Sequence, residues 1–149
     1  MTAKVFVDTN VLVYSRDASE PSKQGRAMAW MSHLWGTRTG RLSFQVLQEF
    51  YSTVTQKLDP GLDVETARRD VRLFLSWQPI AVDARVIERA WHLQDRHSLS
   101  WWDALIIAAA HLTDCRYLLT EDLQADQRYG DIRVIDPFRV SPEALEGNE

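Results

Sequence analysis

Four acidic side chains in this sequence follow or begin strongly apolar segments. Asp8 ends the run "VFVD" near the N-terminus, and Asp122 lies just after the apolar stretch "YLLT". Glu49 occurs in the helical pattern "QVLQEF", and Asp103 begins the apolar run "DALIIAAA". Carboxylates that meet in one site repel one another, so the site takes up protons or binds a cation. Because no Cys or His shares this spacing, a hard ion such as Mg²⁺ or Mn²⁺ fits better than zinc.

Each acid has a simpler structural explanation when it is considered alone. Asp8 could cap the helix that follows it, and Glu49 lies on a polar helical stripe. Ser100 and Asp103 have the spacing of a capping box at the start of a helix. Asp122 could be a turn residue after a strand. The joint placement of the four acids, and not any one of them, therefore indicates a site.

The elements that must position these acids alternate between strand and helix patterns. Strands are predicted at 4–8, 41–43, 80–82, 117–120 and 132–135. Helices are predicted at 22–35, 45–58, 64–77, 84–96 and 101–112, with a short one after a cap at Thr9 or Asn10. This alternation predicts an α/β sandwich around a largely parallel sheet. Ligands of such sheets gather at the carboxyl ends of the strands, where these acids are expected to converge.

Length and composition predict one ordinary globular domain. The chain has 149 residues, of which 45% are hydrophobic and 26% charged, with a net charge of -4. We expect the domain to span 1–140 and a polar, frayed tail, "SPEALEGNE", to complete the chain to 149. The lone cysteine, Cys115, precedes an apolar run and is expected to be a buried bystander. No signal-peptide pattern and no apolar run of about 18 residues occurs, which predicts a cytoplasmic protein without a membrane segment.

The chemistry that matches oxygen-only, carboxylate-held Mg²⁺ is phosphodiester hydrolysis. The metal polarises the phosphoryl group, lowers the pKa of an attacking water and stabilises the leaving oxygen. A phosphohydrolase of the haloacid-dehalogenase type needs a second aspartate two residues after the first, and this chain has Asn10 there. That alternative is therefore poorly supported.

Four blocks of the sequence, taken together, resemble the signature blocks of one family. "VFVDTNVLVY", "QVLQEF", "SWWDALIIAAA" and "LLTEDL" occur in the order and at the separations of the PIN domain. Within that family the pattern is most similar to the VapC-type toxin ribonucleases of bacterial type II toxin–antitoxin systems. The resemblance extends over about residues 4–138.

The resemblance implies a fold, a set of site residues and an activity. The implied fold is a three-layer α/β/α sandwich with a five-stranded parallel sheet. The residues that match the metal-binding acidic quartet are Asp8, Glu49, Asp103 and Asp122. Asn10 matches an amide that orients the first aspartate, and Thr120 matches a hydroxyl beside the last acid. The implied activity is that of a Mg²⁺-dependent endoribonuclease toxin, with Mn²⁺ as a substitute, an RNA substrate, a cognate antitoxin and a homodimeric state.

Three further expectations concern residues around this pattern. After Leu123 the sequence "QADQRYG" departs from the family by delaying its glycine, so Asp126 or Glu121 could assist the site. The helix at 22–35 is apolar and rich in tryptophan, and we expect an antitoxin segment to lie there. A non-catalytic PIN-like scaffold that binds RNA or protein is the alternative function; the presence of all four acids favours the enzyme.

The tryptophans divide into core and surface candidates. Trp30 and Trp91 match helical apolar stripes and are expected in the core. Trp101 and Trp102 are adjacent on a helix and therefore point about 100° apart. One of these two is expected to be exposed, either at a partner surface or near the site.

Overall fold

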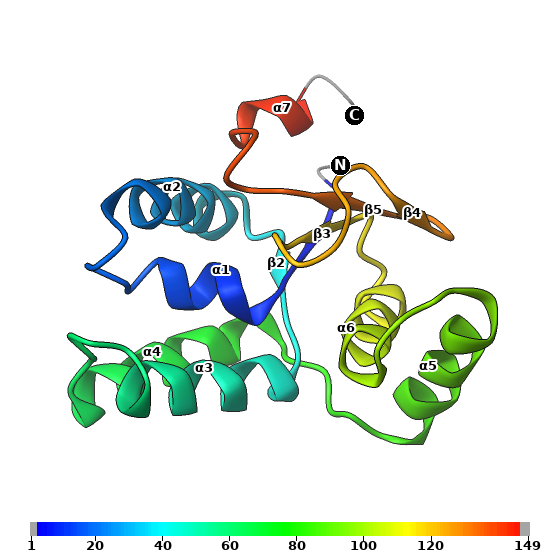
Figure 1. The fold of residues 1–149 in the computed structure, drawn as a ribbon, viewed down its shortest axis with the longest axis horizontal. Coiled ribbons are helices and arrows are strands. Elements are labelled where there is room, and N and C mark those ends of the chain that lie inside the picture. Colours follow the sequence, from blue (N-terminus) through cyan, green and yellow to red (C-terminus); the bar gives the residue numbers. More distant parts are fainter. Residues whose placement is uncertain (1–2, 147–149) are drawn as a thin grey trace.

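The computed structural model describes residues 3–146, in which five strands form one mixed sheet with helices around it (Figure 1). The strands are β1 (Val5–Val7), β2 (Gly40–Arg41), β3 (Tyr117–Leu119), β4 (Arg128–Tyr129) and β5 (Ile132–Ile135). Their order in the sheet is β2-β1-β3-β5-β4. β2, β1, β3 and β5 are parallel, whereas β4 pairs antiparallel with β5. The predicted α/β class and five-stranded sheet are confirmed, with one strand running in the opposite direction.

The central strands are short and buried on both faces. Every residue of β1 ("VFV") and β3 ("YLL") is buried, as is typical of parallel strands covered by helices on both sides. The register pairs Val7 of β1 with Leu119 of β3, so both strands end at the same level. The residues that follow them, Asp8 and Thr120, are therefore brought to one edge of the sheet.

The helices form two groups on either side of the sheet (Figure 1). On one side are α1 (Thr9–Tyr14), α2 (Pro21–Thr37), α3 (Phe44–Gln56) and α4 (Val64–Phe74), the last continued by the 3₁₀ helix η1 (Leu75–Trp77). On the other side are α5 (Ala84–Arg96) and α6 (Trp101–Leu112). A short helix, α7 (Glu143–Glu146), completes the described chain. None of the helices in residues 3–146 has the length and apolar character needed to cross a membrane.

Three predicted details differ from the structure. The cap of α1 is Asp8, whose side chain accepts from the Thr9 amide, and not Thr9 or Asn10. The predicted strand at 80–82 makes only a single bridge, between Ser43 and Ile80. The fifth strand is instead β4, which joins β5 through a two-residue turn in which Gly130 has a φ of 63°. Glycine adopts this left-handed conformation without steric cost.

The C-terminal segment is more ordered than its polar sequence predicts. Residues 143–146 are helical, and Leu145 is buried against the core. The main-chain oxygen of Val140 accepts a hydrogen bond of 3.0 Å from the indole of the buried Trp30. The predicted frayed tail is thus wrong for this segment, and 147–149 lie outside the described residues.

A bidentate ion pair connects the end of α1 to α4 and gives a first testable prediction. Arg16 donates to both carboxylate oxygens of Asp70, at 2.6 and 2.7 Å. The Asp70 side chain is only 10% exposed and that of Arg16 41%. Because Arg16 remains partly solvated, we expect Asp70→Ala to lower the free energy of unfolding by about 1–3 kcal/mol, less than for a fully buried pair.

Urea unfolding followed by circular dichroism measures this change. Glu65→Ala is the matched control, because Glu65 forms an exposed ion pair with Arg68 at 3.6 Å on the same helix. An exposed pair contributes about 0–1 kcal/mol. Equal losses for the two variants would contradict a stabilising role for the Arg16–Asp70 pair.

Candidate functional site

Asp8 is the centre of a polar cluster at the carboxyl ends of β1 and β3. Its side chain is buried, with the residue 8% exposed. One carboxylate oxygen accepts from the Thr9 amide at 2.7 Å, and the other accepts from the Thr120 hydroxyl at 2.9 Å. Burial, with smaller contributions from the negative charges of Asp122 and Glu49, raises the pKa of Asp8 from 3.8 to about 6. The Thr9 and Thr120 hydrogen bonds act in the opposite direction because they favour the charged form.

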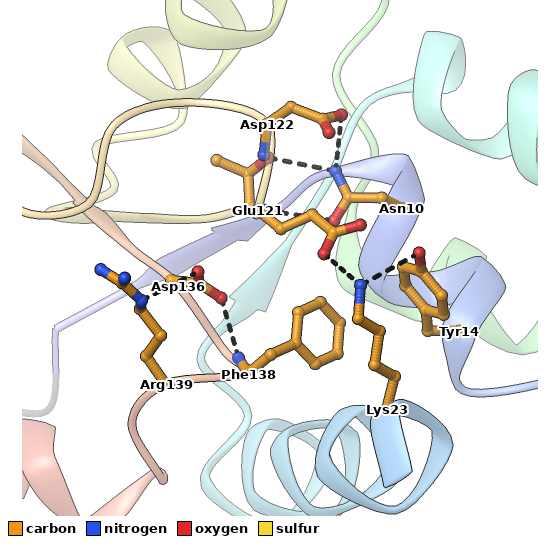
Figure 2. A network of polar contacts seen from close by, with 9 residues as sticks. Asn10, Tyr14, Lys23, Glu121, Asp122, Asp136, Phe138 and Arg139 are labelled. Atoms are coloured by element: carbon orange, nitrogen blue, oxygen red, sulfur yellow. Dashed lines mark hydrogen bonds and ion pairs between the residues drawn. The ribbon is translucent and has the colours of Figure 1, made fainter. Parts of the chain in front are cut away.

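Asn10 connects the two acids that follow the strands. Its side-chain amide donates to Asp122 at 3.0 Å, to the Thr120 hydroxyl at 3.1 Å and, more weakly, to Asp8 at 3.4 Å. Its carbonyl oxygen lies 3.5 Å from the backbone N–H of Glu121. Figure 2 shows Asn10 directed from α1 toward Asp122 and the backbone after β3. The predicted supporting residues Asn10 and Thr120 therefore lie between Asp8 and Asp122.

The other two predicted acids, Glu49 and Asp103, lie on two different helices. Glu49 is exposed on α3, and its charge acts on Asp8. Asp103 lies in the first turn of α6, where its backbone N–H donates to Ser100 at 3.1 Å. This is one half of a capping box; no bond from the Ser100 amide to the Asp103 carboxylate occurs within residues 3–146. The carboxylates of Glu49 and Asp103 make no hydrogen bond or ion pair in that described range.

The four predicted acids are thus brought together unequally. Asp8, Asp122 and Glu49 interact electrostatically, whereas the charge of Asp103 acts on Tyr129, whose pKa is raised mainly by burial. Within residues 3–146, no group of three His, Cys, Asp or Glu side chains is arranged so that it could hold a metal ion without rearrangement. The donor set nevertheless fits a hard divalent ion, because it consists of carboxylate oxygens around an aspartate that is costly to ionise without a nearby cation.

The two acids proposed as helpers have other partners. Asp126 forms an ion pair with Arg133 at 2.6 Å. Glu121 accepts from Lys23 at 2.9 Å, and Lys23 also donates to Tyr14 at 3.4 Å (Figure 2). This Lys23–Glu121 contact connects α2 to the segment after β3. No spacing pattern predicts this contact, because the two residues are far apart in the chain.

Two pockets of different character lie at opposite ends of the strands. One, of about 510 Å³, includes Glu49 together with Trp102, and therefore borders the acidic cluster. The other, of about 720 Å³, lies at the start of β3 and contains four arginines but none of the predicted site acids. The chemistry at the carboxyl ends of the strands, and not pocket size, identifies the first as the relevant one.

Comparison with known proteins agrees with this fold. A family model described as the PIN domain matches residues 5–130. The chain therefore belongs to the PIN domain family, which confirms the family expected from the sequence blocks. A search of curated proteins finds no match.

Three solved structures share the fold. A toxin–antitoxin complex from Klebsiella pneumoniae is similar with a TM-score of 0.63 at 18% identity, over 90% of this chain and 98% of that chain. VapC20 from Mycobacterium tuberculosis, described as a sarcin–ricin loop cleaving toxin, has a TM-score of 0.58 at 23% identity, over 77% of this chain and 87% of its own. VapBC2 from Rickettsia felis, bound to a promoter DNA fragment, has a TM-score of 0.57 at 17% identity, over 87% and 96% respectively.

Proposed function

We propose that this protein is a metal-dependent endoribonuclease that hydrolyses RNA phosphodiester bonds in the cytoplasm as the toxin of a toxin–antitoxin pair. The observation that carries the proposal is the buried Asp8, whose pKa is raised to about 6 by burial and by two neighbouring carboxylates. A divalent cation relieves this repulsion, and the PIN family together with toxin-containing structural neighbours indicates the class of reaction.

The residues of this chain have distinct roles in the proposed mechanism. Asp8, Glu49, Asp103 and Asp122 would hold Mg²⁺ or Mn²⁺. The bound ion supplies Lewis-acid polarisation of the phosphoryl group and a more acidic water. Asn10 and Thr120 fix the orientation of Asp8 and Asp122 through the hydrogen bonds described above. Because these hydrogen bonds hold the carboxylates in place, the carboxylates rearrange less when a metal binds.

A non-catalytic scaffold is less well supported than an enzyme. In a scaffold the acids would serve structure, yet Glu49 and Asp103 make no stabilising contact through their carboxylates anywhere in residues 3–146. Asp8 is also a costly choice for a purely structural cap, because burial opposes its ionisation. Both observations favour a ligand at this edge of the sheet.

We propose that an antitoxin segment docks on a groove between α2 and α4. The sequence predicts that this segment lies on the helix at 22–35, but the apolar stripe of α2 (Ala27, Trp30, Met31 and Leu34) is buried in the domain and is not available to a partner. The exposed apolar residues beside it are Met28, Trp35 and Leu73, which line a pocket of about 320 Å³. An amphipathic helix could insert apolar anchors there. We further propose a homodimer, which light scattering at micromolar concentration tests.

Metal removal is the direct test of the proposed reaction. We expect the purified protein to cleave a mixed cellular RNA pool in Mg²⁺ or Mn²⁺, to stop in excess EDTA, and to recover when Mn²⁺ is restored. Glu49→Gln is expected to lower the cleavage rate by about 10²-fold or more, equivalent to about 2.7 kcal/mol in the barrier.

The control for this experiment is Glu65→Gln, an exposed acid on α4 that lies outside the cluster. It should cleave at the wild-type rate and with the same metal requirement. Cleavage by the wild type that persists in EDTA would reject metal catalysis, and a fully active Glu49→Gln protein would remove Glu49 from the site.

A further inference from the structure

The pocket of about 510 Å³ beside Glu49 combines amide, acidic, aliphatic and aromatic side chains. Its lining residues are Gln45, Gln48, Glu49, Val82, Trp102 and Leu105. They come from the first half of α3, the first half of α6 and the segment before α5. Because Glu49 lines this pocket and its charge also acts on Asp8, the pocket lies beside the place where a scissile phosphate would bind.

Trp102 is the most exposed of the large apolar side chains in this part of the molecule. It is 65% exposed and immediately precedes Asp103. Its neighbour Trp101 instead packs against Trp91, with ring centroids 6.4 Å apart. The sequence predicts Trp91 in the core, but its side chain is 51% exposed and contacts the core only partly, through Trp101. The indole of Trp102 makes no ring contact within residues 3–146.

The polar side chains of the pocket are also without protein partners. Over the described range, the side-chain amides of Gln45 and Gln48 and the indole N–H of Trp102 form no hydrogen bond with the protein. An aromatic face beside free amide donors and acceptors suits a planar heterocycle with a polar edge. An aliphatic side chain of another protein would leave both amides unpaired, which is unfavourable when they become buried.

We propose that Trp102 is a stacking platform for an unpaired nucleobase of RNA, with Gln45 and Gln48 available to its polar edge. This inference rests on the proposed function and adds to it a binding site for one base next to the scissile phosphate. Bases in an A-form duplex cannot reach such a platform, whereas bases in single strands and loops can. Trp102 would thus be a binding residue, next to the metal-holding Asp103.

Anisotropy titration of labelled RNA in EDTA tests this proposal without requiring cleavage. The two probes are a 12-nucleotide single-stranded RNA of mixed sequence and an oligomer of the same length in which every ribose lacks its base. We expect the wild type to bind the base-containing probe more tightly. Trp102→Ala should weaken that binding by about 5- to 150-fold, the range for one base–aromatic stack, and should leave the abasic probe unaffected.

Two further variants separate stacking from loss of structure. Trp102→Phe keeps an aromatic face and should retain most of the preference for bases. Trp91→Ala removes a similarly exposed tryptophan outside the pocket and should retain all of it, with thermal unfolding measured for each protein. Equal binding of both probes by the wild type, or an unchanged base preference in Trp102→Ala, would overturn the inference.

The outcome is distinguishable from the outcome for the proposed function. If the wild type cleaves RNA only with metal, and Trp102→Ala keeps the preference for the base-containing probe, only this inference is rejected. If the preference for the base-containing probe is lost in Trp102→Ala, but the wild type does not cleave RNA, only the proposed activity is rejected. If Trp102→Ala instead converts a dimer into a monomer in light scattering, with RNA binding unchanged, the occupant of the pocket is a second copy of the chain and the inference is overturned.

Discussion

Asp8→Asn is expected to abolish most RNA cleavage while making the metal-free protein more stable. The pKa of Asp8 lies at about 6 instead of 3.8, because the carboxylate is buried next to two other acids. Ionising this side chain in the folded protein therefore costs about 3 kcal/mol more than ionising it in the unfolded chain. The amide of Asn is neutral and has no ionisation cost. It would, however, lose one of the hydrogen bonds that the two carboxylate oxygens accept, which costs about 1 kcal/mol. We expect a net stabilisation of about 1–2 kcal/mol at pH 7.5.

The sign of this effect depends on pH. Below the unfolded pKa of 3.8, Asp8 is neutral in both states and the wild type loses nothing. As the pH rises from about 4 through about 6, the unfolded chain releases its proton first, and the stability of the wild type falls. The advantage of Asp8→Asn should therefore be absent at pH 3.5 and complete above about pH 6.5. Thermal unfolding in EDTA should show a midpoint raised by roughly 2–8 °C at pH 7.5.

Manganese should reverse the order of the two proteins. At about 100 times the Kd, a bound ion stabilises the folded state by about 2.7 kcal/mol, and only the wild type has the charge to hold it. Calorimetry with Mn²⁺ measures the same difference directly. Asp95→Asn, an exposed acid on α5, is the control and should behave like the wild type in every condition. Equal Mn²⁺ binding by wild type and Asp8→Asn would remove Asp8 as a ligand.

The sequence predicts the parts of this fold that local patterns determine. The buried triplets of β1 and β3 read as strands because short β-branched and aromatic runs have few other solutions. Once parallel strands are assumed, the convergence of Asp8 with Asp122 follows from topology. The resemblance to the PIN domain, and not topology, implies supporting roles for Asn10 and Thr120; both side chains lie within hydrogen-bonding distance of these acids.

The features of the fold that the sequence patterns do not predict depend on tertiary contacts. The strand at 80–82 has the right residues, but it meets the rest of the sheet only through Ser43 and Ile80, so packing overrides its propensity. β4 has only two residues and becomes a strand because Gly130 turns it back on β5. The partners of Glu121 and Asp126 were also missed, because Lys23 and Arg133 reach them from other elements. No single-sequence pattern encodes such pairs.

Capping and metal binding by Asp103 predict different effects of Asp103→Asn on stability and on cleavage rate. Its backbone N–H is bound by Ser100, but its carboxylate makes no return bond to the cap in residues 3–146. If Asp103 only favours the helix start, Asp103→Asn should cost at most about 0.5–2 kcal/mol of stability, and the folded protein should remain active. If it holds the metal, the neutral amide should slow cleavage by about 10²-fold or more with little unfolding.

Ser100→Ala provides the matched control, because it removes the observed cap without touching a metal ligand. We expect this variant to lose about 0.5–2 kcal/mol of stability and to keep its cleavage rate once folded. Asp103→Asn should show the opposite result, with stability near that of the wild type and a lost rate. The comparison uses urea unfolding together with cleavage of a mixed RNA pool in Mn²⁺ at a concentration where both variants are folded. If the two variants behave alike, losing stability and keeping their rate, Asp103 belongs to the cap and the metal site consists of the three acids that interact electrostatically, Asp8, Glu49 and Asp122.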